Sequence, residues 1–105
     1  MQSADEPTKE YVLFMHNDAP DGGKPRPVAE WNAYFEELNA EHEFKGGSSI
    51  GGGFCMNRNG ASPEISSRIF GFIRIRVRDL QRAKELVALN PVFRAGGTVE
   101  VRELV

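Results

Sequence analysis

The sequence predicts an α+β sandwich whose elements follow the order βαββαβ. Residues 69–77 and 98–102 alternate apolar and polar side chains with the period of a strand. Residues 28–41 and 80–90 repeat apolar side chains every three or four positions, as an amphipathic helix does. An apolar run over residues 10–16 and a glycine-rich segment supply the remaining strands. Two helices and four strands are therefore expected in one domain.

The chain of 105 residues has the size of a single domain, with residues 10–105 as the folded unit and residues 1–9 as a flexible N-terminal segment. So short a chain buries only about two thirds of its unfolded surface, which favours association. A formal net charge of -2 argues against nucleic acid and anionic membranes as partners. Neither a signal peptide nor a membrane span is evident, and one cysteine permits no internal disulfide, so a cytoplasmic location is expected.

The first half of the chain predicts a buried strand, a loop and a helix. The run "EYVLFMH", residues 10–16, is typical of a strand that is buried on both faces. Pro27 fits the first turn of a helix, where a missing N–H group costs nothing. Along that helix, one face is expected to carry Val28, Trp31, Phe35 and Leu38, with Tyr34 at its flank.

Residues 43–63 form the glycine-rich segment. Six glycines between Gly46 and Gly60 weaken any regular element, so we expect an irregular, bulged second strand. A phosphate-cradling loop is disfavoured, because the Gly-Lys-Ser/Thr ending of such loops is missing. Cys55, beside Met56, is expected to be a small buried apolar side chain.

The second half repeats the strand and helix pattern. In the third strand, Ile73, Ile75 and Val77 are expected to face the helices, which leaves for the open face Phe70, Phe72, Arg74 and Arg76. Asp79 is a good N-cap for the second helix, which ends before Pro91. In the last strand, Val99 and Val101 face the helices, and the open face receives Thr98, Glu100 and Arg102.

The two predicted helices cover one face of the sheet and leave the other bare. That open face mixes phenylalanines with arginines, and a row of phenylalanines is not expected to face water. A second copy of the same sheet is the simplest cover, because a two-fold interface lets one surface serve both partners. The sequence therefore predicts a homodimer that pairs through its open sheet faces.

The segment "NPVFRAGGTVEVREL", residues 90–104, resembles the C-terminal signature of the YCII-related (DGPF-type) proteins. Upstream, "GFIRIRVRDLQRAKELVALNP", "YVLFMHND" and "WNAYFEELNAEHEFKGG" are similar to the family's second strand–helix block, opening strand and first helix. The resemblance extends from Tyr11 to Leu104. It implies a ferredoxin-like fold that pairs as a dimeric α/β barrel, with a cleft at the open sheet face.

The chain also departs from that family. The DGPF motif is replaced by "ASPEISSRIFGF", residues 61–72. Other branches carry a His–Asp pair with a catalytic role, but Trp31 stands near the place of that histidine and "GFCMNRNG" has no aspartate. Some relatives eliminate halide from chlorinated aromatic diols, and without the pair that reaction is not transferred to this chain.

Two interpretations of the remaining polar residues stay open. His16 ends the first strand and is expected near Thr98, Glu100 and Arg76, so His16 and Glu100 are the candidate catalytic pair, in which the carboxylate fixes the histidine tautomer. Arg74 or Arg76 would then clamp an anionic group of a ligand. Alternatively, His16 ends its strand with a structural hydrogen bond and the arginines pair with Glu100 across the dimer.

Two functions follow from these interpretations. The first is a small-molecule site on the open face, with acid/base chemistry at His16 and ligand contacts from Trp31, Phe70, Phe72, Arg74 and Arg76. The second is a non-enzymatic interaction or regulatory module, of the kind that the family's association with sigma factors implies. An ordered anion on the arginines would favour the first, and arginines paired with carboxylates the second. No metal or cofactor is expected, because His16, Asp18 and Asp21 have the pattern of a turn.

Overall fold

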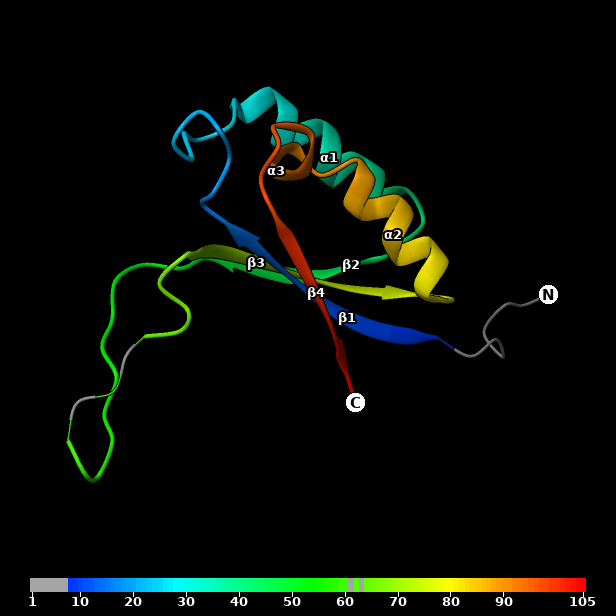
Figure 1. Cartoon of the computed structure of the whole chain (residues 1–105). Helices are drawn as coiled ribbons and strands as arrows, with labels where there is room; N and C mark the ends of the chain where they lie inside the picture. Colours follow the sequence, from blue (N-terminus) through cyan, green and yellow to red (C-terminus); the bar gives the residue numbers. More distant parts are fainter. Residues whose placement is uncertain (1–7, 61, 63) are drawn as a thin grey trace.

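The computed structural model describes residues 8–60, 62 and 64–105. They form a four-stranded antiparallel sheet in the order β2-β3-β1-β4, with the helices on one face (Figure 1). This is the predicted α+β, ferredoxin-like arrangement. Most of the segment expected to be flexible, residues 1–9, lies outside the described residues, and Lys9 already belongs to the first strand.

The central strands β1 (Lys9–His16) and β3 (Ile69–Val77) place their apolar side chains on the helix side. Leu13 lies opposite Ile73 and Tyr11 opposite Ile75. The outer strands are β4 (Val99–Leu104), which pairs with β1, and β2 (Phe44–Ser49), which pairs with β3. A register shift between Phe44 and Gly46 confirms the bulge expected in the second strand.

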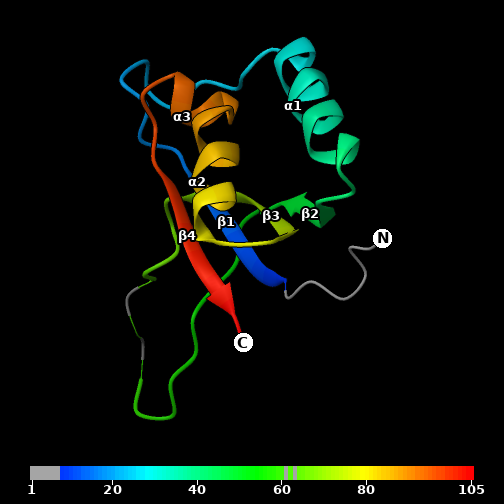
Figure 2. The same cartoon turned by 90° about the vertical axis from the view of Figure 1, so that its right-hand side faces the viewer.

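The helix layer consists of α1 (Val28–Ala40), α2 (Leu80–Ala88) and the short α3 (Pro91–Arg94), all above one face of the sheet (Figure 2). Asp79 caps α2 as predicted, since its carboxylate accepts a hydrogen bond from the Arg82 N–H group at 2.9 Å. The turn α3 was not predicted. It forms because Asn90 stops α2, accepts from the Val92 N–H group at 2.8 Å and is followed by Pro91 at the first helical position.

The predicted face of α1 is wrong in part. Tyr34 is only 3% exposed, whereas Val28 is 73% exposed. The helix is turned so that Tyr34 and Leu38 face the core, because the Tyr34 hydroxyl donates a hydrogen bond to the Leu86 carbonyl oxygen at 3.0 Å. Trp31 and Phe35 remain half-buried and pack against the edge of the core.

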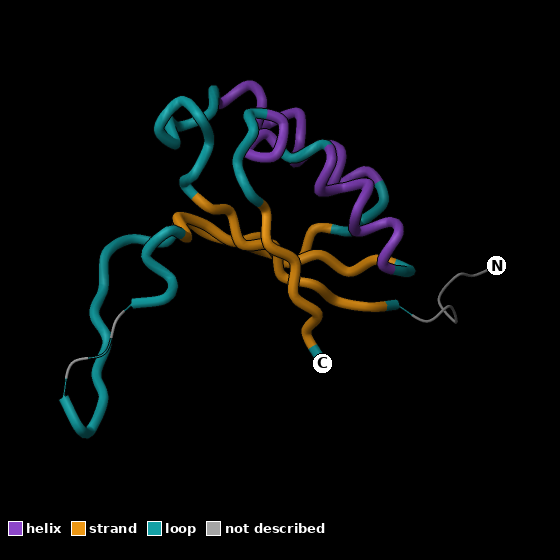
Figure 3. Tube along the Cα trace, viewed as in Figure 1, coloured by secondary structure: helices purple, strands orange, loops and turns teal. Residues whose placement is uncertain are grey.

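The glycine-rich segment is a strand only at its beginning. β2 ends at Ser49, and the described residues that follow, 50–60, 62 and 64–68, form a long arm that leaves the sheet on the side opposite the helices (Figure 3). Cys55 lies on this arm and is exposed, so its predicted burial is wrong. In the described part of the chain, the helices are too short and too polar to span a lipid bilayer.

Candidate functional site

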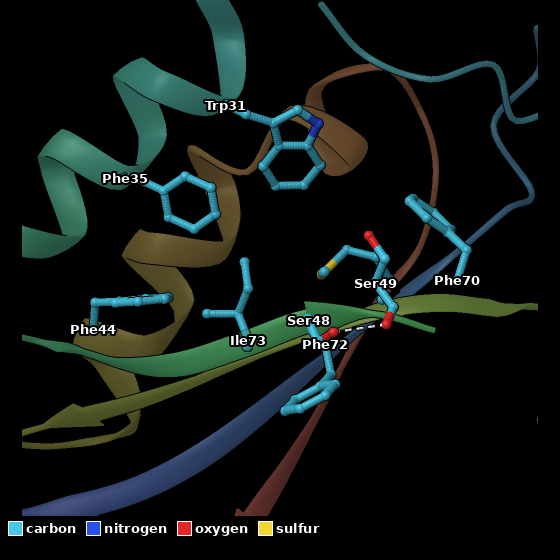
Figure 4. Close-up of a pocket in the computed structure, with 11 residues that line it drawn as sticks. Trp31, Phe35, Phe44, Ser48, Ser49, Phe70, Phe72 and Ile73 are labelled. Atoms are coloured by element: carbon cyan, nitrogen blue, oxygen red, sulfur yellow. Dashed lines mark hydrogen bonds between the residues drawn. The ribbon is translucent and has the colours of Figure 1, made fainter. Parts of the chain in front are cut away.

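A cavity of about 300 Å³ lies between α1 and the sheet, on the helix side (Figure 4). Its walls are mostly aromatic: Trp31 and Phe35 come from α1, Phe44 from the start of β2 and Phe70 from the start of β3. The rest of the lining comes from the sheet, at Met15, Gly47, Ser48, Ser49, Gly71, Phe72 and Ile73. We call this cavity the aromatic pocket.

The aromatic walls are held by contacts among themselves. Trp31 and Phe35 lie one helical turn apart and stack, with ring centroids 5.9 Å apart and an interplanar angle of 26°. The Phe44 ring meets Phe35 edge-on at 5.4 Å. Such contacts fix ring orientation beyond what area burial alone provides. The walls therefore form a pre-organised surface.

Two glycines on the sheet side of the aromatic pocket leave room that a side chain would take. A Cβ atom at Gly47 would lie 2.4 Å from the Phe72 carbonyl oxygen, and one at Gly71 would lie 3.3 Å from the Met15 methyl carbon. Any larger residue at Gly47 would push the backbone of β2 and β3 apart. The glycines thus allow the close strand approach beneath the pocket.

A salt bridge holds the Phe44 wall in place. The preceding residue, Glu43, is buried, and its two carboxylate oxygens accept from Arg82 of α2 at 2.8 and 2.9 Å. This bidentate contact raises the pKa of Arg82 above its already high value. Since Glu43 also accepts the Arg76 N–H group through its backbone oxygen, the segment that leads to Phe44 is tied to both α2 and β3.

His16 and Glu100 meet as predicted, but away from the aromatic pocket. The ring nitrogen His16 Nε2 lies 2.9 Å from Glu100 Oε1. The backbone N–H group of His16 donates to the Thr98 carbonyl oxygen. The predicted proximity of Arg76 is wrong, because β3 runs antiparallel to β1 and carries Arg76 to the far end, opposite Glu10. Neither His16 nor Glu100 lines the aromatic pocket.

Two arginines of the open face, Arg74 and Arg76, are paired with a carboxylate. Glu10 accepts from Arg76 at 2.5 Å and from Arg74 at 3.4 Å, and these contacts lower the pKa of Glu10, that to Arg76 most strongly. Both arginine side chains remain nearly half exposed. For Arg74 and Arg76 this is the carboxylate pairing that the sequence analysis considered, but the partner is Glu10 of the same chain and not Glu100.

The expected placement of Phe70 on the open face is wrong. Phe70 packs against the core and lines the aromatic pocket, whereas the Phe72 side chain points to the other side of the sheet (Figure 4). The cause is a register shift: His16 pairs with Ile69 and Met15 with Gly71, so Phe70 is an extra residue between the two pairs. Such a bulge breaks the strict alternation on which the prediction relied.

Of the predicted ligand contacts, the aromatic pocket therefore brings together the side chains of Trp31 and Phe70. Phe72 also lines it but turns its side chain to the open face, and Arg74 and Arg76 lie outside it. Sequence reasoning missed Phe44, Met15, Ser48 and Ser49 as lining residues. Phe44 offered one signal, since a large aromatic residue close to two glycines, Gly46 and Gly47, can pack over a backbone that has no side chains. The serines offered none, because their position depends on the length of β2.

The described residues contain no cluster of three His, Cys, Asp or Glu side chains that could hold a metal ion. Asp18 and Asp21, which the sequence analysis considered as metal ligands, bond neighbouring side-chain and backbone groups instead. Asp18 accepts from the Thr98 hydroxyl and N–H groups at 2.6 and 2.8 Å, which lower its pKa. Asp21 bonds Arg26, whose guanidinium lowers the pKa of this carboxyl.

No family model matches the chain. No curated protein matches it either. Among solved structures, it is similar to the 5-chloro-2-hydroxyhydroquinone dehydrochlorinase TftG from Burkholderia phenoliruptrix AC1100, in complex with 2,5-dihydroxybenzoquinone. The TM-score is 0.52 over 91% of this chain and 93% of that chain, with 12% sequence identity. At this identity, the likeness shows a shared fold.

Proposed function

We propose that the chain binds a small, flat, uncharged molecule in the aromatic pocket, and that two copies pair through their open sheet faces. The first part is supported by one observation: a pre-organised cavity of about 300 Å³ has aromatic walls and no charged lining residue in the described chain. Cavities of this volume with few polar groups are the common form of small-molecule sites.

The walls favour a ring. The stacked Trp31 and Phe35 present flat faces, and an aromatic ligand gains offset-stacking or edge contacts with them. At the sheet side, Ser48 donates its hydroxyl hydrogen to the Ser49 carbonyl oxygen at 2.8 Å. The polar groups of the lining side chains are therefore the lone pairs of the Ser48 oxygen, the Ser49 hydroxyl and the indole N–H group of Trp31. A ring with one or two hydroxyl groups satisfies both features.

The same lining disfavours an anion. Burying a charge without a counter-charge is costly, and Arg74 and Arg76 bond Glu10 outside this cavity. Because His16 and Glu100 also lie outside it, the pocket lining lacks the side chains of general acid–base chemistry. We therefore propose a binding role for the pocket, and no acid–base role for His16 toward its ligand.

Trp31 is the chain's single tryptophan and lines the pocket, so its fluorescence reports occupancy. Hydroquinone is expected to quench Trp31 and to raise the unfolding temperature, whereas benzoate and 2,5-dihydroxybenzoquinone, which ionise at neutral pH, bind at least about tenfold more weakly. The last compound is included because the dehydrochlorinase of shared fold holds it. Tighter binding of the ionised rings would refute the uncharged ligand class.

Two variants locate the binding. Phe35→Ala removes a wall and is expected to weaken hydroquinone binding about tenfold, which is the value of one good aromatic contact. Phe93→Ala is the control, because Phe93 is an exposed aromatic residue on α3 outside the pocket. Equal effects of the two substitutions would place the ligand elsewhere.

The second part of the proposal is supported by the composition of the open face. Phe14 lies between Phe72 and Glu100, and in the next row Val12 lies between Arg74 and Arg102. Apolar side chains in the centre with charges around them are typical of an interface. Arg102 has no ion-pair partner among the described residues, while Glu100 offers its second carboxylate oxygen beside His16.

These two residues suit a two-fold axis. Glu100 and Arg102 stand two positions apart on β4, so an axis that crosses the strands near Val101 places each Arg102 over the partner's Glu100. The apolar rows then face each other as well, since Phe14 and Val12 are the register partners of Glu100 and Arg102. A single contact is thereby used twice.

A charge exchange tests this pairing. Glu100→Arg and Arg102→Glu each place like charges together, so each variant alone is expected to be monomeric in sedimentation equilibrium where the wild type is dimeric. Mixed, the two variants restore both opposite-charge contacts and are expected to form a heterodimer in native mass spectrometry. A monomeric wild type, or no heterodimer on mixing, would overturn the pairing.

A further inference from the structure

The arm, of which residues 50–60, 62 and 64–68 are described, lies between β2 and β3 and extends far from the body of the chain (Figures 1 and 2). Its base is fixed, because Ile50 donates to the Phe70 carbonyl oxygen and Asn17 to that of Arg68. Its tip is a defined turn, in which Asn57 and Gly60 form an isolated bridge and the Asn59 N–H group donates to the Asn57 side chain at 2.9 Å. The arm thus has a base that is bonded to the sheet and a tip that is a turn bonded within itself.

The arm carries large apolar side chains into solvent. Phe54 is 80% exposed, Met56 85% and Ile65 97%. Single exposed apolar residues are common on protein surfaces, but several on one projecting segment mark an interaction site. The rest of the chain lies behind the arm's base, on the sheet and helix side, and leaves these side chains uncovered.

The direction of the arm indicates which molecule covers its apolar side chains. It leaves the sheet on the side opposite the helices, which is the side of the open face (Figures 1 and 2). Anything that covers that face lies beside the arm, and packed sheets are about 10 Å apart, well within the reach of so long a segment. The arm's charged residues, Arg58, Glu64 and Arg68, do not form the basic cluster that a membrane surface requires.

We propose that the arm is a clasp for a second copy of this chain, in which Phe54, Met56 and Ile65 pack against the partner. This inference rests on the proposed pairing of the open faces. The two-fold axis that joins Arg102 to the partner's Glu100 exchanges the two ends of the face. The arm, which starts at the His16 end, therefore runs past the partner at its opposite end, where Glu10 and Arg76 lie.

The clasp explains why the chain exposes these side chains. By symmetry, each dimer contains two such contacts, so both arms are covered at once. A small domain gains most from such burial, because its own core is limited. On the open face, the charged side chains limit the gain from burial. The arm adds apolar contact with the partner outside that face.

Crosslinking tests whether the contact is between chains. A photoreactive benzoylphenylalanine replaces Phe54 in the full chain, and this protein is mixed with ¹⁵N-labelled protein before irradiation. We expect crosslinks between labelled and unlabelled chains, at peptides that contain the Glu10 or Arg76 end of the partner. Crosslinks confined to one chain, or none in a sample that is dimeric, would overturn the clasp.

A variant measures the energetic contribution. Replacing Phe54, Met56 and Ile65 together by serine is expected to raise the dimer dissociation constant about 100-fold or more, as for the loss of central apolar contacts. Replacing Val28 and Phe93, which are exposed in the helix layer, by serine is the matched control and should leave it unchanged. A dimer of unchanged affinity in the arm variant would refute the clasp.

The two proposals fail in different ways. If the charge-exchanged variants form their heterodimer while the arm variant loses no affinity, the pairing of the faces stands and the clasp does not. If the wild type is monomeric at about 100 µM, far above the range of specific complexes, both are wrong.

Discussion

The salt bridge between Glu43 and Arg82 gives the sharpest stability test, because it is bidentate and largely buried. The two side chains are 10% and 16% exposed. Glu43→Gln removes the negative charge and leaves the guanidinium in place with only the exposed Glu85 as a neighbouring carboxylate, at 3.2 Å. An uncompensated charge in such a position is much less well solvated than in water.

The expected magnitude follows from that burial. Breaking a buried pair from one side costs about 3 to 5 kcal/mol, and the residual exposure places this pair near about 3 kcal/mol. For a domain of this size, each kcal/mol lowers the unfolding temperature by about 4 to 8 °C, so a fall of about 12 °C or more is expected. That is a large part of the total stability of a small domain.

The assay is urea unfolding followed by circular dichroism, together with a thermal scan. The midpoint should fall in Glu43→Gln while the slope of the free energy against urea stays constant. Glu85→Gln is the control and should cost less than about 1 kcal/mol, since Glu85 contacts Arg82 from an exposed position. The double variant Glu43→Gln/Arg82→Met, which removes both charges, should recover at least half of the loss.

The refuting result is equally specific. If Glu43→Gln and Glu85→Gln destabilise the chain equally, the buried geometry of the pair carries no additional energy. The Phe44 wall of the aromatic pocket would then need another support, because Glu43 directly precedes it in the chain.

Other predictions follow from single buried or bonded groups. Tyr34→Phe removes one buried hydrogen bond and should cost about 1 kcal/mol. Because burial raises the Tyr34 pKa from 10.0 to about 12, the wild type should lose stability as pH rises through this interval, and the variant should lose less in the same thermal scans. Leu38→Ala should cost about 2 to 5 kcal/mol in urea unfolding, since Leu38 is fully buried, whereas Val28→Ala should cost less than about 0.5. Asp18→Asn should lower the unfolding temperature at pH 7, and this difference should vanish as pH falls below 3.8 through the lowered pKa of Asp18; a difference that persists in acid would refute the Asp18–Thr98 contribution.

Local patterns predicted most of the fold because the residues that carry them act over short distances. Asp79 caps α2 through a side chain three residues from its donor, and Gly96, at a φ of 92°, turns the chain before β4. The alternation in β3 placed Ile73 and Ile75 correctly in the core. The likeness to the dehydrochlorinase of known structure supports the same arrangement at the level of the fold.

The site was harder to predict because it depends on two long-range adjustments. The bulge between β1 and β3 moves Phe70 to the helix side, and the turn of α1 is set by the bond from Tyr34 to α2. Neither adjustment leaves a local trace, since each involves residues far apart in the sequence. A strict two-residue period therefore placed Phe70 on the wrong face.

The pairing of His16 with Glu100 was predicted, yet its neighbours were not, for a reason of strand direction. An antiparallel partner brings the beginning of β3 to the end of β1, so Arg76 lies near Glu10 and far from His16. The charged residues are thereby divided into separate groups at the two ends of the open face. This division separates His16 from the arginines of the predicted anion clamp and leaves opposite charges that the proposed two-fold interface can use.

The resulting layout separates the two proposed activities and also defines where they can interact. In the proposed arrangement, the ligand lies on the helix side of the sheet and the partner on the other, so the two would bind without direct contact. Strand β3 belongs to both, because Phe70 lines the pocket while Phe72, two residues later, turns its side chain to the open face. Strand β1 is shared in the same way, because Met15 lines the pocket and Phe14 lies on the open face. Any effect of ligand binding on pairing that passes through these strands has to be matched by an equal effect of pairing on ligand affinity. A dimer affinity that is the same with and without hydroquinone would mean that the sheet is rigid enough to keep the two faces independent.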